Sequence, residues 1–108
     1  MGESTELANA MDRLWAKFLP QMEQRVTTLR KVAEDHGNGS LSREDQRRAS
    51  AEAHKLAGVL GTFGLQRGTE LAREAEEAYG GNLDRSLAVS ERLTQIAEQL
   101  REMIAGRK

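Results

Sequence analysis

Apolar residues recur at intervals of three and four along most of this chain, and that spacing is typical of one face of an α-helix. The repeat is regular near the C-terminus, where it comprises Val89, Leu93, Ile96, Leu100 and Met103. The 108 residues include one proline and few aromatic side chains, a composition that favours helices over strands. We therefore expect an all-α protein of a size that forms one domain.

The helical segments should form an antiparallel four-helix bundle with an additional N-terminal helix. Pro20 has no amide hydrogen and disfavours helical geometry at Leu19, so we expect the chain to break there. The predicted helices span about residues 5–19, 20–35, 43–63, 67–79 and 82–105. Residues 1–108 would form a single domain with a core of about 20–105 and an accessory helix of about 5–19. The last helix should pack within the bundle rather than pair in a dimeric coiled coil, so we expect a monomer.

Several residues are predicted to mark helix ends. Gly37 and Gly64 should stop the helices that precede them, because glycine adopts the backbone conformation that ends a helix. Ser42 opens a capping box, and Asn82 is the expected N-cap of the last helix. His36 lies just before Gly37, where an imidazole interacts well with the negative end of the helix dipole. We expect a structural role for His36.

Charge and composition disfavour several classes of function. Lys and Arg number 16 against 17 Asp and Glu, a net charge of -1, which gives no overall field to hold nucleic acid or an anionic membrane. There is no cysteine to form a disulfide, a zinc site or a thiol nucleophile. The N-terminus has no secretory signal and no apolar run is long enough to cross a bilayer. We expect a cytoplasmic protein without membrane or nucleic-acid partners.

The chain also lacks the motifs of a self-sufficient enzyme. It has no G-x-x-x-x-G-K-[ST] loop, no H-E-x-x-H pair and no G-x-S-x-G turn. Ala33 and Ala51 occupy the positions three residues before the two histidines, where helical metal sites carry glutamate. We therefore expect no metal site, no cofactor and no nucleotide site in this chain.

The segment 54–64 contains the residues that indicate a function. At about 100° per residue, Leu56, Leu60 and Phe63 gather on one side of the predicted helix, and His54 points the opposite way, toward solvent. The residues expected around His54 on that outer face are all small: Ser50, Ala51, Ala57, Gly58 and Gly61. The sequence thus predicts an exposed imidazole on a nearly bare surface.

The two glycines on this face need an explanation, because glycine within a helix costs about 1 kcal/mol relative to alanine. Gly58 and Gly61 could mark a helix end or let another helix of the chain approach closely. The interpretation we favour is that a second macromolecule must bring a reactive group to His54. Neighbouring side chains would then have to be small.

The string Ala53-His54-Lys55-Leu56-Ala57-Gly58, followed by Gly61, Gly64 and Ala75-Glu76, resembles the signature of histidine-containing phosphotransfer (Hpt) domains. With the helical pattern around it, the resemblance covers about residues 20–105. Many members have Lys or Arg three positions after the histidine. Here that position is Ala57, and Lys55 is one position after His54.

The resemblance implies a phosphoryl carrier in a two-component phosphorelay, with His54 as the phosphoacceptor. The group would pass between His54 and the aspartate of a receiver domain, and the receiver or a hybrid histidine kinase would be the partner. Mg²⁺ would be bound by the partner. Arg47, Lys55 and Arg67 are candidates to offset the phosphate charge. The alternative is a docking or inhibitory module that uses the same face without phosphotransfer.

Overall fold

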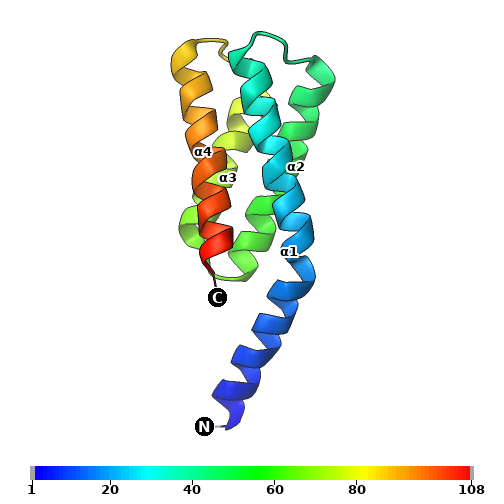
Figure 1. The fold of residues 1–108 in the computed structure, drawn as a ribbon, viewed down its shortest axis with the longest axis vertical. Coiled ribbons are helices and arrows are strands. Elements are labelled where there is room, and N and C mark those ends of the chain that lie inside the picture. The colour runs from blue at the N-terminus through cyan, green and yellow to red at the C-terminus, as the bar shows by residue number, and fades with distance from the viewer. Residues whose placement is uncertain (1, 108) are drawn as a thin grey trace.

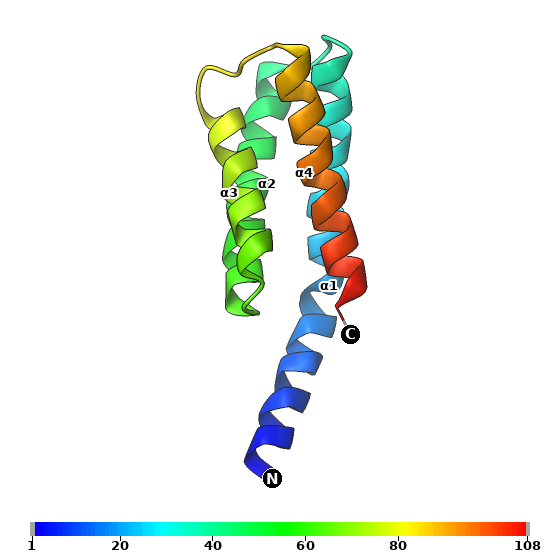
Figure 2. The ribbon, with the colours of Figure 1, turned by 90° about the vertical axis from the view of Figure 1, so that its left-hand side faces the viewer.

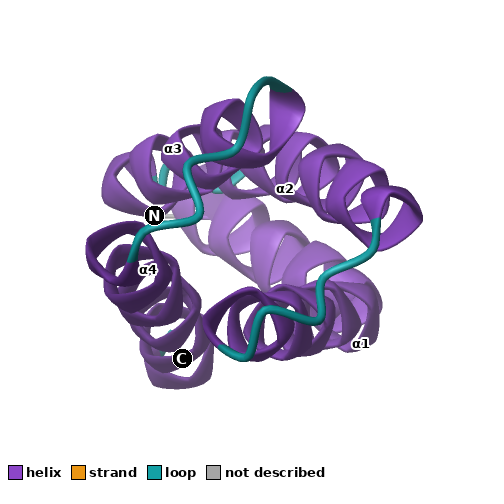
Figure 3. Ribbon diagram, turned by 90° about the horizontal axis from the view of Figure 1, so that it is seen from above, coloured by secondary structure: helices purple, strands orange, loops and turns teal. Residues whose placement is uncertain are grey.

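The protein is all-helical in a computed structural model, which describes the backbone of residues 2–107 and the side chains of residues 5–107. The helices are α1 (Gly2–Gly37), α2 (Arg43–Thr62), α3 (Gln66–Gly80) and α4 (Leu87–Gly106). They run alternately up and down (Figure 1), and seen from the end they enclose a common core (Figure 3). α2 packs most extensively on α3, and α1 packs most extensively on α4 (Figure 2). The predicted all-α bundle is confirmed.

The predicted break at Pro20 is wrong, because α1 continues through this residue. The proline removes one backbone hydrogen bond, but residues on both sides of it anchor the helix: Trp15 and Met22 are both buried. Burial of large apolar side chains on either side outweighs the loss of one bond. The expected additional helix is therefore the N-terminal half of α1.

The first turns of α1 project beyond the rest of the bundle (Figure 1). Leu7 is 66% exposed, so the predicted apolar stripe does not pack on the bundle from its start. Packing begins at Trp15, whose ring meets Phe63 edge-to-face with a centroid separation of 5.0 Å. The guanidinium of Arg107 lies 4.6 Å from the centre of the Trp15 ring, a cation–π contact that joins the C-terminal end of the chain to α1.

Most helix ends lie where the sequence places them. The Ser42 hydroxyl accepts a hydrogen bond from the Asp45 amide at 3.0 Å, which caps α2. Gly64 follows α2 with a φ of 71°, a conformation that favours glycine. The prediction for α4 is wrong: Ser86, not Asn82, is the N-cap. Residues 81–86 are needed to cross from α3 to α4 at the end of the bundle (Figure 2).

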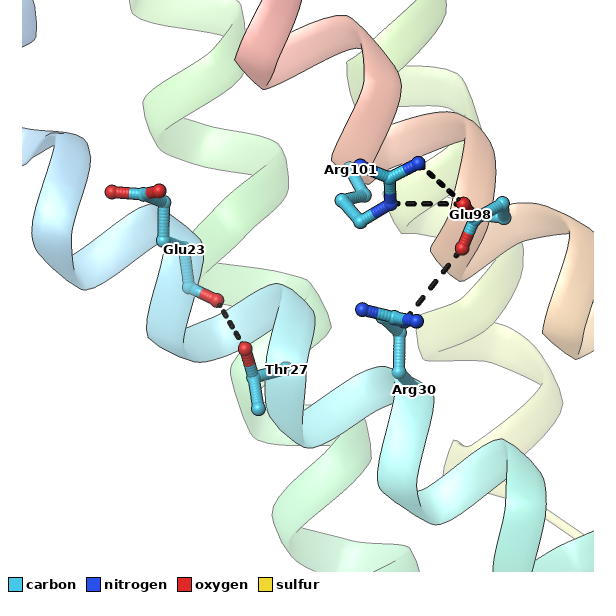
Figure 4. Close-up of polar contacts among 5 residues, drawn as sticks. All are labelled: Glu23, Thr27, Arg30, Glu98 and Arg101. Atoms are coloured by element: carbon cyan, nitrogen blue, oxygen red, sulfur yellow. Dashed lines mark hydrogen bonds and ion pairs between the residues drawn. The ribbon is translucent and has the colours of Figure 1, made fainter.

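The core is built from the predicted apolar stripes. Its largest fully buried side chains are Met22, Leu56, Leu60, Leu71, Ile96 and Leu100. On the surface, Arg30 of α1 lies 3.6 Å from Glu98 of α4, and Glu98 also accepts hydrogen bonds from Arg101 (Figure 4). This ion-pair cluster links α1 to α4.

One buried polar atom leads to a stability prediction. The Tyr79 hydroxyl is buried and has no hydrogen-bond partner among the described residues, and burial raises the pKa of this hydroxyl above its usual value. A buried, unpaired polar group is destabilising. Tyr79→Phe should therefore raise the free energy of unfolding by about 1 kcal/mol, measured by urea denaturation. Tyr79→Leu is the control and should lower the free energy of unfolding, because it removes the aromatic ring that fills the core. A loss of stability in Tyr79→Phe would mean that the hydroxyl has a partner.

Candidate functional site

His54 lies in the middle of α2, on the side that faces solvent. Its side chain is 73% exposed, whereas its neighbours Ala53 and Leu56 are completely buried. The apolar residues turn the helix so that the imidazole must point outward. The predicted exposure of His54 is confirmed.

Glu76 of α3 contacts this imidazole. The His54 Nδ1 and the Glu76 Oε2 are 2.8 Å apart, a hydrogen-bond distance. An ionised carboxylate only accepts hydrogen bonds, so Nδ1 is the protonated nitrogen and donates a hydrogen bond to the Glu76 carboxylate. In a neutral imidazole the other ring nitrogen, Nε2, then keeps its lone pair. The sequence showed Glu76 only as part of a family resemblance, and nothing in its spacing from His54 predicted this contact.

The small residues expected around His54 divide into two groups. Ala57 is 4% exposed and is thus buried, so its predicted place on the outer face is wrong. α3 covers this flank of α2, and the Thr69 hydroxyl donates to the Ala57 carbonyl oxygen. Ser50 is half-buried on the same flank, and its hydroxyl donates to the Glu76 carbonyl oxygen at 3.2 Å. Ser50 therefore helps to hold α3 beside His54.

Gly58 and Gly61 are exposed, as predicted. A Cβ atom added at Gly58 would meet nothing within 4 Å. One added at Gly61 would meet only the Thr69 hydroxyl oxygen, at 3.5 Å, which is an ordinary van der Waals contact. Internal packing therefore does not require either glycine, and the surface at these two positions beyond His54 carries no side chain and is open.

On the other side of His54, toward the start of α2, the surface is hollowed into an open cleft of about 840 Å³. His54 and Glu76 lie on its border, and four basic residues line it: Arg43, Arg47, Lys55 and Arg85. Arg47 and Lys55 were candidates from the sequence. Arg67 does not line the cleft, and its guanidinium Nη1 lies 3.5 Å from the Glu70 Oε2. Arg43 and Arg85 were missed, because nothing in the sequence shows that the loop 81–86 reaches the start of α2.

Two buried or half-buried side chains fix this loop. The Gln46 amide donates to the Tyr79 and Gly81 carbonyl oxygens at 2.9 and 3.2 Å. The His36 imidazole is 4% exposed, and its Nε2 donates to the Asp84 carbonyl oxygen at 2.8 Å. The structural role expected for His36 is therefore confirmed, although its contact is with this loop. The Ser86 amide donates to the Asp84 carboxylate, which lowers the pKa of that carboxyl.

The described residues hold no group of three or more histidine, aspartate and glutamate side chains arranged to bind a metal ion. Within the same residues, no helix is both long and apolar enough to cross a membrane. The chemistry that the site offers is that of an exposed, oriented nucleophilic nitrogen on a helical bundle, with nearby cations and an open approach surface. These features define a class of proteins that receive a group from another macromolecule.

Comparison with known families agrees with this class. Residues 13–106 match the Hpt domain, and the chain belongs to this family. Hpt domains are phosphotransfer carriers of phosphorelay signalling rather than catalytic enzyme domains, and they interact with receiver domains and kinases.

The chain is also similar to Protein RcaC of Microchaete diplosiphon, with 34% identity over 71 residues. The aligned segment covers 66% of this chain and 11% of that relative, so the chain spans about a tenth of the length of the relative it matches. No solved structure matches the chain significantly.

Proposed function

We propose that this protein carries a phosphoryl group on His54, which it receives from the phospho-aspartate of a receiver domain and passes to another receiver. The observation that carries the proposal is the contact between the exposed His54 side chain and Glu76. In a neutral imidazole this contact places the hydrogen on Nδ1, so that Nε2 keeps its lone pair. The match to the Hpt family supports the same role.

The transfer step follows from this geometry. The Nε2 lone pair attacks the phosphorus atom, the bond between phosphorus and the aspartyl oxygen breaks, and the aspartate leaves as a carboxylate. No proton has to move, because Nδ1 keeps its hydrogen throughout. The imidazole ring gains positive charge as the Nε2–P bond forms, and the Glu76 carboxylate at 2.8 Å from Nδ1 stabilises that charge.

The remaining parts of the reaction belong to the partner. In-line phosphoryl transfer needs a positioned donor and cations that offset the charge on the phosphoryl oxygens. Lys55 and Arg47 contribute positive charge from the cleft, and the receiver domain brings the aspartate with its Mg²⁺. The open surface at Gly58 and Gly61 lets the receiver approach His54 closely.

The test is incubation of the protein with a receiver domain that has been phosphorylated with radiolabelled acetyl phosphate and Mg²⁺. Label should appear on this protein and should be lost in acid but retained in base, the stability expected of a phosphohistidine. A protein that binds the receiver but takes up no label would instead be a docking or inhibitory module.

The two basic residues of the cleft that the sequence singled out give a second prediction. Lys55→Ala and Arg47→Ala should each slow phosphoryl uptake, or shorten the lifetime of the phosphorylated form, by about two- to fivefold, as expected for exposed charge pairs. Initial rates and decay of the label measure the two effects. Arg73→Ala is the control, since Arg73 is exposed on α3 and does not line the cleft. If the double mutant at 47 and 55 behaves like this control, the charge on the phosphate is offset by the partner alone.

A further inference from the structure

The four basic side chains in the cleft have no acidic partners. We define the basic cleft as Arg43, Arg47, Lys55 and Arg85. Within the part of the chain that the structure describes, none of the four forms an ion pair. Glu76 is the one acidic residue among the described residues that line the cleft, and its carboxylate is engaged with His54. The cleft is thus strongly positive in a chain whose net charge is -1.

Elsewhere on the described surface, several basic side chains form ion pairs with carboxylates. Arg30 and Arg101 share Glu98 (Figure 4). Arg92 makes a bidentate pair with Glu74 at 2.6 and 2.7 Å, and this pairing lowers the pKa of the Glu74 carboxyl. Single unpaired cations occur elsewhere on the described surface, but the basic cleft gathers four of them around one hollow.

Local stability does not explain this arrangement. Arg43 is the first residue of α2, where the helix dipole disfavours a positive charge. Arg43 and Arg47 are also four residues apart on one helix, a spacing at which like charges repel. Both effects destabilise the folded protein, so some other interaction must favour these side chains.

Arg85 is held in place by the loop that carries it. Gln46 fixes the start of residues 81–86 through the Tyr79 and Gly81 carbonyl oxygens, and buried His36 fixes the middle through Asp84. Arg85 directly follows this second anchor. Its backbone is thus positioned at the start of α2 before any partner arrives.

We propose that the basic cleft binds carboxylates on the receiver domain that exchanges the phosphoryl group with His54; this inference rests on the proposed function. Arg43 precedes His54 by 11 residues, or about 16 Å along a helix. The receiver therefore places an acidic segment over the start of α2 and the loop 81–86, well away from the reacting atoms. The cleft fixes the direction in which the receiver lies across α2 and speeds its association.

The experiment compares two double charge reversals with equal changes in charge. The first is Arg43→Glu with Arg85→Glu. The control is Arg13→Glu with Lys17→Glu, which are exposed on α1 and make no ion pair in the described structure. These two control residues point away from Trp15 and therefore away from the bundle. The receiver is one that transfers its phosphoryl group to the wild-type protein. The initial rate of phosphoryl uptake is measured as a function of the concentration of this phosphorylated receiver.

The cleft reversal should raise the half-saturating receiver concentration on the order of tenfold at low salt, and the difference should shrink as salt screens the charges. The control should change it less than about twofold. Arg43→Lys with Arg85→Lys should restore wild-type behaviour. Thermal unfolding separates binding from folding, because Arg43→Glu removes an unfavourable charge at the helix start and should keep or raise the melting temperature.

Equal effects of the two reversals would overturn the inference while leaving the proposed function intact. A second result would also overturn the inference. The cleft reversal would abolish binding of inorganic tripolyphosphate but leave the half-saturating receiver concentration unchanged, and the cleft would then bind a small anion. Absence of label on the wild type would contradict the proposed function, and this inference with it.

Discussion

His54→Gln should abolish phosphoryl uptake from a labelled receiver domain and leave the helical circular dichroism and the melting temperature nearly unchanged. Glutamine has no nucleophilic ring nitrogen. The His54 side chain is 73% exposed, so its removal leaves the core intact, and an exposed pair such as His54–Glu76 contributes little to stability. Scintillation counting of the separated protein measures uptake.

His36→Gln is the matched control, because it removes the other histidine of the chain. This variant should still take up label. It should also melt at a lower temperature, because the buried His36 imidazole holds the loop at Asp84. Label that persists on His54→Gln would exclude His54 as the phosphoacceptor. Reduced uptake by a folded His36→Gln would instead reflect displacement of the loop at Asp84.

Bulky residues at Gly58 or Gly61 should impair phosphotransfer far more than they affect folding. Gly58→Ala and Gly61→Ala should each raise the free energy of unfolding by up to about 1 kcal/mol, the difference in helix propensity. Gly58→Gln and Gly61→Leu should keep most of this gain but obstruct the receiver. Overpacking a close contact costs about 1–3 kcal/mol, so uptake should fall by about five- to 150-fold. Urea denaturation and initial transfer rates measure the two effects.

Gln95→Leu is the control for an added apolar side chain, since Gln95 is an exposed residue of α4. This variant should take up the phosphoryl group at the wild-type rate. The contrary result would be that Gly61→Leu unfolds the protein and Gly58→Ala destabilises it. These glycines would then be sites of close internal packing, and the docking surface would lie on another side of α2.

The sequence predicted the helices of the bundle well because their apolar residues are spaced for burial. α2 was expected over 43–63 and spans Arg43–Thr62. Leu56 and Leu60 are completely buried as expected, and that burial determines the outward direction of His54. Local pattern was sufficient here because one amphipathic helix orients all its side chains together.

The errors have a common physical cause, which is that local signals compete with packing between distant segments. Pro20 is a strong local breaker, yet Trp15 and Met22 bury themselves on either side of it and keep α1 continuous. Asn82 and Ser86 are both good caps, and in the structure α4 begins only after residues 81–86 have connected it to α3, so Ser86 is the cap.

The candidate site shows the same limit. Ala57 lies only about 60° around the helix from His54, and the sequence does not say which flank of α2 is covered by α3. The structure places α3 on the flank of Ala57 and Ser50, which buries the first and brings Glu76 to His54. The basic cleft was missed for a similar reason, because Arg43 and Arg85 meet only in the folded protein.

The most direct test of the proposed function is the position of the phosphoryl group on the imidazole, measured by ¹⁵N and ³¹P NMR of the phosphorylated protein. Glu76 holds the hydrogen on Nδ1 of His54, so the phosphorus should be bonded to Nε2 of His54, with Nδ1 still protonated. Phosphorus on Nδ1 of His54, on His36 or on a carboxylate would contradict the proposed mechanism.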